Sequence, residues 1–241
     1  MELSIIIPMY NEAAIAEACV RTLTGAMESA GMSYEILFSD DGSTDGCAAI
    51  IEKTARELVL SGGEVRVVRA GRNRGKGHAV RLGMRAAQGD FCVFTDCDLA
   101  YGTDVIPAMA ARMKASPADV LIGSRAIADD GYAGYTLTRK LASKAYVRLL
   151  ALSAGFRYTD SQCGIKMFRR EAAQKIFPLA ETDGWAFDFE LLLLADKFGY
   201  TIEEHPVTVL NHRESKVHLL RDSLRMAGDV REIKKRIEKR E

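Results

Sequence analysis

The sequence predicts an α/β protein with a mostly parallel, doubly wound sheet and helices on both faces. Short apolar runs alternate with helical patterns through the first half of the chain. Several of these runs are followed directly by acidic or polar residues. Hydrophobic residues fill 48% of the 241 positions, which is enough for a sizeable core. A chain of this length forms one large domain or two small ones.

The first half supplies the alternation. Apolar runs of strand length lie at Leu3–Pro8, Tyr34–Ser39, Glu64–Arg69, Phe91–Thr95 and Asp119–Ile122. Helical patterns lie between them at Glu12–Ala30, Asp45–Leu60, Gly75–Ala87 and Thr103–Ala115. Ser43–Asp45 offers an N-cap for the second of these helices. Strands that alternate with helices in this way form parallel sheets.

The second half has a different pattern. Apolar residues recur at helical spacing from Leu137 to Leu152, and short strands are expected at Ile165–Phe168 and Thr201–Val209 around a helix at Ala186–Phe198. From Val217 onward, apolar residues at three- and four-residue steps predict an amphipathic helix with a basic polar face. We expect this helix to dock on the core, with contact to anionic lipid as the alternative.

Charge is distributed unevenly although the formal net charge is zero. Residues 131–159 contain no acid but five bases, and residues 216–241 carry nine Lys or Arg and five Asp or Glu. Two basic segments on a neutral protein indicate a polyanionic partner, with solvated helix faces as the alternative. Nucleic acid is not expected, because aromatic residues are only 7% and none lie among the tail bases.

The five cysteines are odd in number and show no C-x-x-C pair, so we expect reduced thiols and no zinc site. The apolar run at Leu3 has no basic leader, and no apolar stretch is long enough to cross a bilayer. We therefore expect a cytoplasmic protein without a signal peptide or transmembrane helix. A homo-oligomer is compatible with the sequence.

The run Phe91–Thr95 ends in Asp96 and Asp98, two carboxylates one residue apart. The carboxyl ends of parallel strands form the edge at which α/β proteins bind ligands. Two hard oxygen donors at that edge suit Mg²⁺ or Mn²⁺, which can bridge to a nucleotide diphosphate. Such a pair also occurs as a simple helix cap, so its meaning depends on the neighbouring motifs.

Other segments lead to the same edge. Pro8 is expected to stop the first strand, and Tyr10 and Glu12 follow it. Asp41 follows the second strand, where a carboxylate can accept the imino hydrogen of uracil or guanine. Lys76 follows the third strand at a helix N-terminus, a position that suits a diphosphate or a sugar. The glycine spacing around it excludes a P-loop, because the spacer is one residue short and no Ser or Thr follows the lysine.

Together these segments resemble the family 2 glycosyltransferases of GT-A fold. The matching segments, in family order, are PMYNE (8–12), DDGSTDG (40–46), NRGKGHA (73–79) and DCDLA (96–100). Four later segments resemble the polyprenyl-phosphate subgroup, and within it most closely the dolichyl-phosphate glucose synthases. These are IGSR (122–125), DSQCGIKMF (160–168), WAFDFELL (185–192) and HRESKV (212–217). The resemblance covers nearly the whole chain, from Leu3 to about Lys216.

The resemblance implies a catalytic domain over residues 1–216, followed by the amphipathic helix of 217–241. Its nucleotide-binding half would end near 125, and its acceptor half would cover 126–216. The implied activity is an inverting, metal-assisted transfer of a hexose, glucose from UDP-glucose, to a polyprenyl phosphate such as dolichyl or undecaprenyl phosphate. A peripheral position at the inner face of the membrane goes with that acceptor.

The resemblance also implies roles for particular residues. Asp96 and Asp98 would hold Mg²⁺ or Mn²⁺. Residues implied in catalysis are Asp98, Arg125, Arg139 and Asp188, with both arginines facing phosphates. Nucleotide-sugar binding is implied for Pro8, Tyr10, Glu12, Asp41, Lys76, Asp96, Arg213, Ser215 and Lys216. The acceptor region would contain Asp160, Gln162 and Trp185.

Two alternatives stay open at this point. Ala100 stands where the mannose-type enzymes of the subgroup have a glutamine, which favours a UDP-sugar but leaves UDP-N-acetylglucosamine and GDP-mannose as donors to consider. A lipid phosphate is already ionised and needs positioning more than a base. A soluble or polysaccharide hydroxyl would need a base, and Asp188 occupies the matching position. A catalytically silent nucleotide-sugar-binding module is a further hypothesis, against which the intact Asp96, Asp98, Arg125 and Lys216 count.

Overall fold

The computed structural model describes residues 1–131, 157–210 and 219–239, with the backbone alone for 219–227. The expected helix at 137–152 and the HRESKV segment therefore lie outside the described residues. The helix expected from 217 is described from Leu219.

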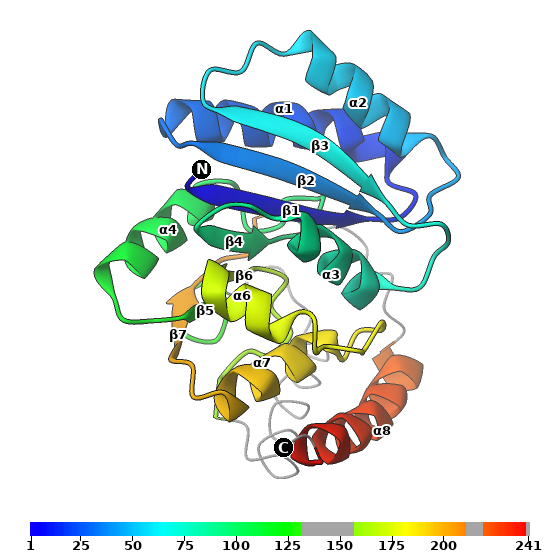
Figure 1. Ribbon diagram of the computed structural model, residues 1–241, viewed down its shortest axis with the longest axis vertical. Coiled ribbons are helices and arrows are strands. Elements are labelled where there is room, and N and C mark those ends of the chain that lie inside the picture. The colour runs from blue at the N-terminus through cyan, green and yellow to red at the C-terminus, as the bar shows by residue number, and fades with distance from the viewer. Residues whose placement is uncertain (132–156, 211–218, 240–241) are drawn as a thin grey trace.

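The core is a seven-stranded sheet in the order β3-β2-β1-β4-β6-β5-β7 (Figure 1). All adjacent pairs are parallel except those made by β6, which runs antiparallel to both β4 and β5. The strands are β1 (Leu3–Met9), β2 (Tyr34–Asp40), β3 (Gly63–Arg69), β4 (Phe91–Phe94), β5 (Val120–Ser124), β6 (Lys166–Arg169) and β7 (Ile202–Pro206). The predicted mostly parallel sheet is confirmed, and strands from both sides of residue 125 belong to it.

Side chains of β1 alternate between two core layers, as the period of a strand requires. Ile5 and Ile7 pack in the layer that contains α1 (Ala13–Ser29), α2 (Cys47–Glu57) and α4 (Val105–Ala115). Ile6 packs in the opposite layer. That layer contains α3 (Lys76–Ala86), α6 (Arg170–Ile176), α7 (Phe187–Lys197) and α8 (Leu219–Glu238). Helices therefore cover both faces of the sheet, which makes it doubly wound.

The C-terminal helix α8 docks on the core. Val230, Ile233 and Ile237 are 1%, 2% and 6% exposed and belong to the same layer as α7. Lys197 of α7 donates a hydrogen bond from Nζ to the carbonyl oxygen of Ile237 at 2.7 Å. Docking, the first of the two roles expected for this helix, is confirmed for its described half, and Figure 1 shows α8 beside α7. Within the described residues, no helix combines the length and apolar character needed to span a bilayer.

Three local predictions were wrong. Pro8 does not stop β1, which continues to Met9. Strand β1 pairs with β4 only as far as Ile6, whereas its pairing with β2 extends to Met9. Pro8 therefore lies where β1 is paired with β2 alone. The N-cap residue of α2 is Gly46 in a left-handed conformation and not one of Ser43–Asp45, although Asp45 accepts the N–H of Cys47 from the position before it. Helix α6 was not predicted, because its seven residues are fewer than two turns and give too short a periodic pattern.

Candidate active site

The candidate site lies at the carboxyl ends of β1, β2 and β4. Strand β1 is hydrogen-bonded to both β2 and β4, so the chain leaves the middle of the sheet in two directions at this point. Ligands of open α/β sheets bind in the crevice at such a switch point. The fold therefore brings the ends of three predicted motif strands to one edge.

The loops after β1 and β2 are bound to one another. Asn11, which has a left-handed φ of 53°, donates its N–H to Ser43 Oγ and accepts the N–H of Thr44 at Oδ1, both at 2.9 Å. Asp45 accepts the N–H of Ala13 at 2.8 Å and that of Cys47 at 3.1 Å. One carboxylate thus binds the first residue of both α1 and α2. Burial raises the pKa of Asp45, but these amide hydrogen bonds outweigh it and hold the pKa below its usual value.

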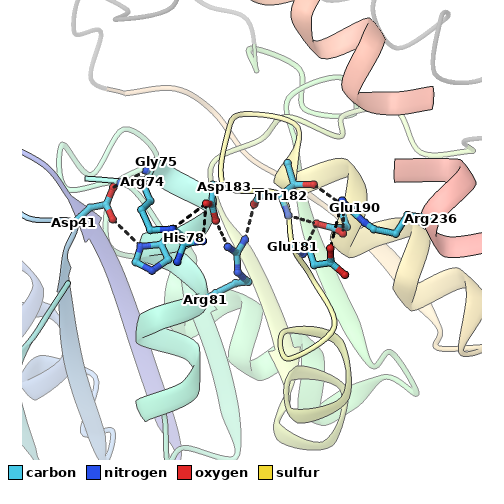
Figure 2. A network of polar contacts seen from close by, with 10 residues as sticks. All are labelled: Asp41, Arg74, Gly75, His78, Arg81, Glu181, Thr182, Asp183, Glu190 and Arg236. Atoms are coloured by element: carbon cyan, nitrogen blue, oxygen red, sulfur yellow. Dashed lines mark hydrogen bonds and ion pairs between the residues drawn. The ribbon is translucent and has the colours of Figure 1, made fainter. Parts of the chain in front are cut away.

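Asp41 binds the loop that leads into α3. Its carboxylate is buried and accepts the N–H groups of Arg74 at 2.8 Å and Gly75 at 2.6 Å on Oδ2. The other oxygen lies 2.8 Å from Nδ1 of His78 (Figure 2). The structure thus gives Asp41 a role in fixing the start of α3. Its contact with a nucleobase stays a prediction.

Lys76 is the first residue of α3 and points to the end of β4. Its ammonium lies 2.5 Å from Asp96 Oδ1 and 5.7 Å from the ring centroid of Trp185. Burial lowers the pKa of Lys76, but the carboxylates of Asp96 and Asp188 outweigh that effect and raise it. Trp185 is 39% exposed, so it forms a wall of the site rather than part of the core.

Asp96 and Asp98 lie on a tight turn after β4. Leu99 has a left-handed φ of 50° and donates its N–H to the carbonyl of Asp96, while Ala100 donates its N–H to Asp98 Oδ1 at 3.2 Å. Both carboxylates are half-buried. Gly164 passes so close to Asp96 that a side chain at that position would collide with the carboxylate.

The donor set of this turn fits a divalent cation in part. Within the described parts of the chain, no three side chains of His, Cys, Asp or Glu gather into a metal site. Two hard carboxylate oxygens beside a paired ammonium nevertheless suit Mg²⁺ or Mn²⁺, which commonly binds one or two carboxylates together with substrate phosphates. All five cysteines are buried and form no disulfide in the structure.

Behind the site, Asp188 at the start of α7 pairs with Lys166 of β6. Lys166 Nζ lies 2.5 Å from Asp188 Oδ1 and donates to the carbonyl oxygen of Cys163 at 2.7 Å. The Lys166 side chain has no exposed surface and that of Asp188 is 5% exposed. Burial raises the pKa of Asp188 in spite of the two lysines that oppose it. Lys166 was not predicted as a site residue, although a lysine inside an apolar strand was a usable signal.

A second buried pair joins Arg125 to Asp160. The guanidinium donates from Nε to Oδ2 at 2.6 Å and from Nη2 to Oδ1 at 2.7 Å. Burial lowers the pKa of Arg125, but the hydrogen bonds that it donates to Asp160 outweigh this effect and raise the pKa, so the group stays charged. Arg125 was expected to face a phosphate, and the structure shows it paired with Asp160. Beside this pair, Ser161 Oγ and Gln162 Nε2 are buried and have no hydrogen-bond partner in the described residues.

The structure therefore brings most predicted site residues to one region and leaves four outside the described chain. Pro8 is buried in β1, Tyr10 is 41% exposed and Glu12 precedes α1, all at the switch-point edge. Positions that lie outside the described residues are Arg139, Arg213, Ser215 and Lys216. Residues that sequence reasoning missed include Arg81 and Asp183, which bond to each other beside Lys76.

The chain is similar in sequence to known glycosyltransferases. The family profile described as Glycosyl transferase family 2 matches residues 4–177. The dolichyl-phosphate beta-glucosyltransferase of Saccharomyces cerevisiae is 33% identical over 242 residues, which cover 95% of this chain and 72% of the yeast protein. The protein of the same name from Drosophila melanogaster is 32% identical, with coverage of 95% and 73%.

A solved structure agrees with the fold. Glucosyl-3-phosphoglycerate synthase from Mycobacterium tuberculosis, in complex with Mn²⁺, uridine diphosphate and phosphoglyceric acid, superposes with a TM-score of 0.69. It is 20% identical in sequence and covers 98% of this chain and 78% of its own, so it supports the fold alone. The likeness of the fold and the family match together define a glycosyltransferase of GT-A fold. The chain belongs to glycosyl transferase family 2, and within that family it is similar to the dolichyl-phosphate beta-glucosyltransferases.

Proposed function

We propose that this enzyme transfers glucose from UDP-glucose to a polyprenyl phosphate, with inversion and with the help of Mg²⁺ or Mn²⁺. The geometry that carries the proposal is the Lys76–Asp96 pair beside Asp98 at the switch point of the sheet. The relatives named dolichyl-phosphate beta-glucosyltransferase support the sugar and the acceptor, since they match almost the whole chain.

The residues of the donor side have distinct tasks in this proposal. Asp96 and Asp98 would hold the divalent cation, which when bound offsets the negative charge that develops on the leaving diphosphate. Lys76 would exchange part of its contact with Asp96 for a diphosphate oxygen. Trp185 would form a wall beside the sugar, and Asp41 keeps the start of α3 in place for Lys76.

The acceptor side needs positive charge more than a base. A phosphate monoester is ionised at neutral pH, so its oxygen can attack the anomeric carbon without losing a proton to the enzyme. The acid-free segment 131–159 supplies five bases toward such an acceptor. The positive charge of Arg125 is less available to an acceptor phosphate than expected, because the guanidinium donates two hydrogen bonds to Asp160.

A hydroxyl acceptor is the second candidate, and one observation favours it. Burial raises the pKa of Asp188, which moves that carboxylate toward the range of a general base. Against this, Oδ1 of Asp188 already binds the buried ammonium of Lys166. UDP-N-acetylglucosamine and GDP-mannose remain alternative donors.

A panel of labelled nucleotide sugars tests the donor and the acceptor together. The protein is incubated with each sugar, Mn²⁺ and undecaprenyl or dolichyl phosphate, and the organic phase is extracted. We expect label in that phase with UDP-glucose in particular. Transfer from GDP-mannose that is at least as fast as from every UDP-sugar would overturn the donor assignment.

Two variants separate the acceptors. If the acceptor is a phosphate, Arg139→Ala should raise the KM for polyprenyl phosphate with little effect on donor affinity, because a charge-assisted contact contributes about 1.5–3 kcal/mol. Asp188→Asn should then keep measurable turnover, and no limb of its pH profile should be lost. Abolished transfer in an Asp188→Asn variant that keeps the wild-type circular dichroism and melting temperature, together with a mild Arg139→Ala, would instead assign Asp188 as a base for an alcohol.

We also propose peripheral membrane contact through the segment 137–152, which carries leucines and bases. The described half of α8 contributes less than its sequence suggested, since its apolar face is buried on the core. Flotation with anionic liposomes should be sensitive to salt, because each base near an anionic surface adds about 1 kcal/mol. Equal recovery on neutral and anionic liposomes at low salt would contradict this proposal.

A further inference from the structure

A polar network connects the C-terminal helix to the start of α3 (Figure 2). Its centre is the bridging segment, residues 181–184, which lies between α6 and α7. On one side the segment bonds to α7 and α8, and on the other side it bonds to α3. Two residues proposed for the donor site, Lys76 and Trp185, are the chain neighbours of residues that this network holds, Gly77 and Gly184.

The first side of the bridging segment is fixed by Glu190 and Arg236. Glu190 of α7 is fully buried and accepts the N–H groups of Glu181 at 3.0 Å and Thr182 at 2.7 Å on Oε2. Its other oxygen, Oε1, lies 2.5 Å from Arg236 Nη2. The same Nη2 donates to Thr182 Oγ1 at 3.0 Å. Arg236 of α8 therefore neutralises a buried carboxylate and binds the segment directly.

The second side is fixed by the start of α3. Asp183 accepts from Arg81 and from Arg74, whose Nη2 lies 2.9 Å from Oδ2. The carbonyl oxygen of Asp183 accepts the N–H of Gly77 at 2.9 Å. The backbone approaches so closely here that a side chain on Gly77 would collide with the carbonyl oxygen of Thr182. These contacts hold the bridging segment and the first turn of α3 together as one unit.

The positions of Lys76 and Trp185 follow from this unit. Lys76 is adjacent to Gly77, and Trp185 is the residue after the bridging segment, so both ends of the Lys76–Trp185 contact are attached to it. We propose that Arg236 and Glu190 are positioning residues for the donor diphosphate site, and that they act through the bridging segment. The nature of the ligand rests on the function proposed above; the positioning itself does not.

The sole tryptophan of the chain, Trp185, gives a readout that needs no ligand. Arg236→Gln removes the charge that faces Glu190 and should raise acrylamide quenching of Trp185 fluorescence. Lys235→Gln makes the same charge change at an exposed position of the same helix and should leave quenching unchanged. Arg236→Lys keeps a charged donor and should restore part of the wild-type value. Equal quenching in Arg236→Gln and Lys235→Gln would overturn the proposal.

Binding of uridine diphosphate with Mn²⁺ by calorimetry tests the consequence for the site. We expect the Kd to rise about tenfold in Arg236→Gln, below the roughly 100-fold that a 1 Å misplacement can cost a reaction. The KM for the donor should rise while the KM for the acceptor stays the same. Ile233→Val loosens the docking of α8 without touching the network and is the matched control for general loosening. A similar rise in Ile233→Val would overturn a specific role for Arg236.

Failure of the proposed function gives a different result. If the wild-type protein binds neither uridine nor guanosine diphosphate in the presence of Mn²⁺, the proposed donor is wrong. The quenching comparison in the absence of ligand still decides whether Arg236 positions Trp185.

Discussion

Two lysine–aspartate pairs lie in this site with the same separation of 2.5 Å, but they differ in burial. In the pair of Lys76 and Asp96, the side chains are 17% and 34% exposed. In the pair of Lys166 and Asp188, they are 0% and 5% exposed. In a partly exposed pair, either side chain can give up its contact with the other for a contact with a ligand at small cost, because water already screens the two charges. A fully buried pair cannot, since separation would leave an uncompensated charge in the interior. Equal distances therefore go with different capacities: the pair of Lys76 and Asp96 can exchange partners with a ligand, and the pair of Lys166 and Asp188 cannot.

The largest effect should come from breaking the buried pair. Lys166→Met leaves Asp188 charged and buried, which should lower the free energy of unfolding by about 3–5 kcal/mol. Urea denaturation measures this loss. The double variant Lys166→Met/Asp188→Leu should recover much of it, because an apolar pair needs no counter-charge.

Urea denaturation of a variant of the partly exposed Lys76–Asp96 pair tests whether burial distinguishes the two pairs. Lys76→Met should lower the free energy of unfolding by less than about 1 kcal/mol, since Asp96 is a third exposed. Equal losses in Lys166→Met and Lys76→Met would show that burial does not distinguish the two pairs.

Asp98 should matter for turnover and little for stability. Asp98→Asn should lower turnover by about 100-fold or more, because a metal ion supplies several kcal/mol of charge stabilisation in the transition state. Its melting temperature should match the wild type, and Asp104→Asn, an exposed change six residues further on, is the control. Full activity of Asp98→Asn in excess EDTA would contradict the metal role.

The smallest effect concerns the pH dependence of the Lys76 pair. The pKa of Lys76 is raised above its usual 10.5, because the neighbouring carboxylates outweigh the effect of burial. The stabilisation by its ammonium is therefore complete below pH 10.5 and is lost as the pH rises through the raised pKa.

The stability gap between wild type and Lys76→Met should accordingly be widest below pH 10.5 and should narrow as the pH rises through the raised pKa of Lys76. Lys53→Met, at a site that is 76% exposed, serves as the control for general surface charge. A gap that stays constant or widens with pH would show that the ammonium of Lys76 does not stabilise the fold.

Strands and most helices could be predicted from local sequence because their pattern is local. The apolar run before Asp96, for example, needed no knowledge of its neighbours to be assigned as a strand. The role of the two carboxylates that follow it could be interpreted only together with the neighbouring motifs. Helix α6 escaped prediction since its pattern is too short, and Pro8 was misread because only one side of the β1 ladder continues past Ile6.

The sequence by itself determined which motifs the chain carries. It also predicted that Asp41, Lys76 and Asp96 lie at one edge of the sheet, because each of them follows a different strand of the predicted parallel sheet. Tertiary structure alone decided the partners. Arg125 binds Asp160 across 35 positions, and Arg236 binds Glu190 across 46. Side chains so far apart in sequence meet only through the packing of sheet and helices. Burial, which separates a binding pair from a supporting one, is likewise a property of the packed core rather than of any residue.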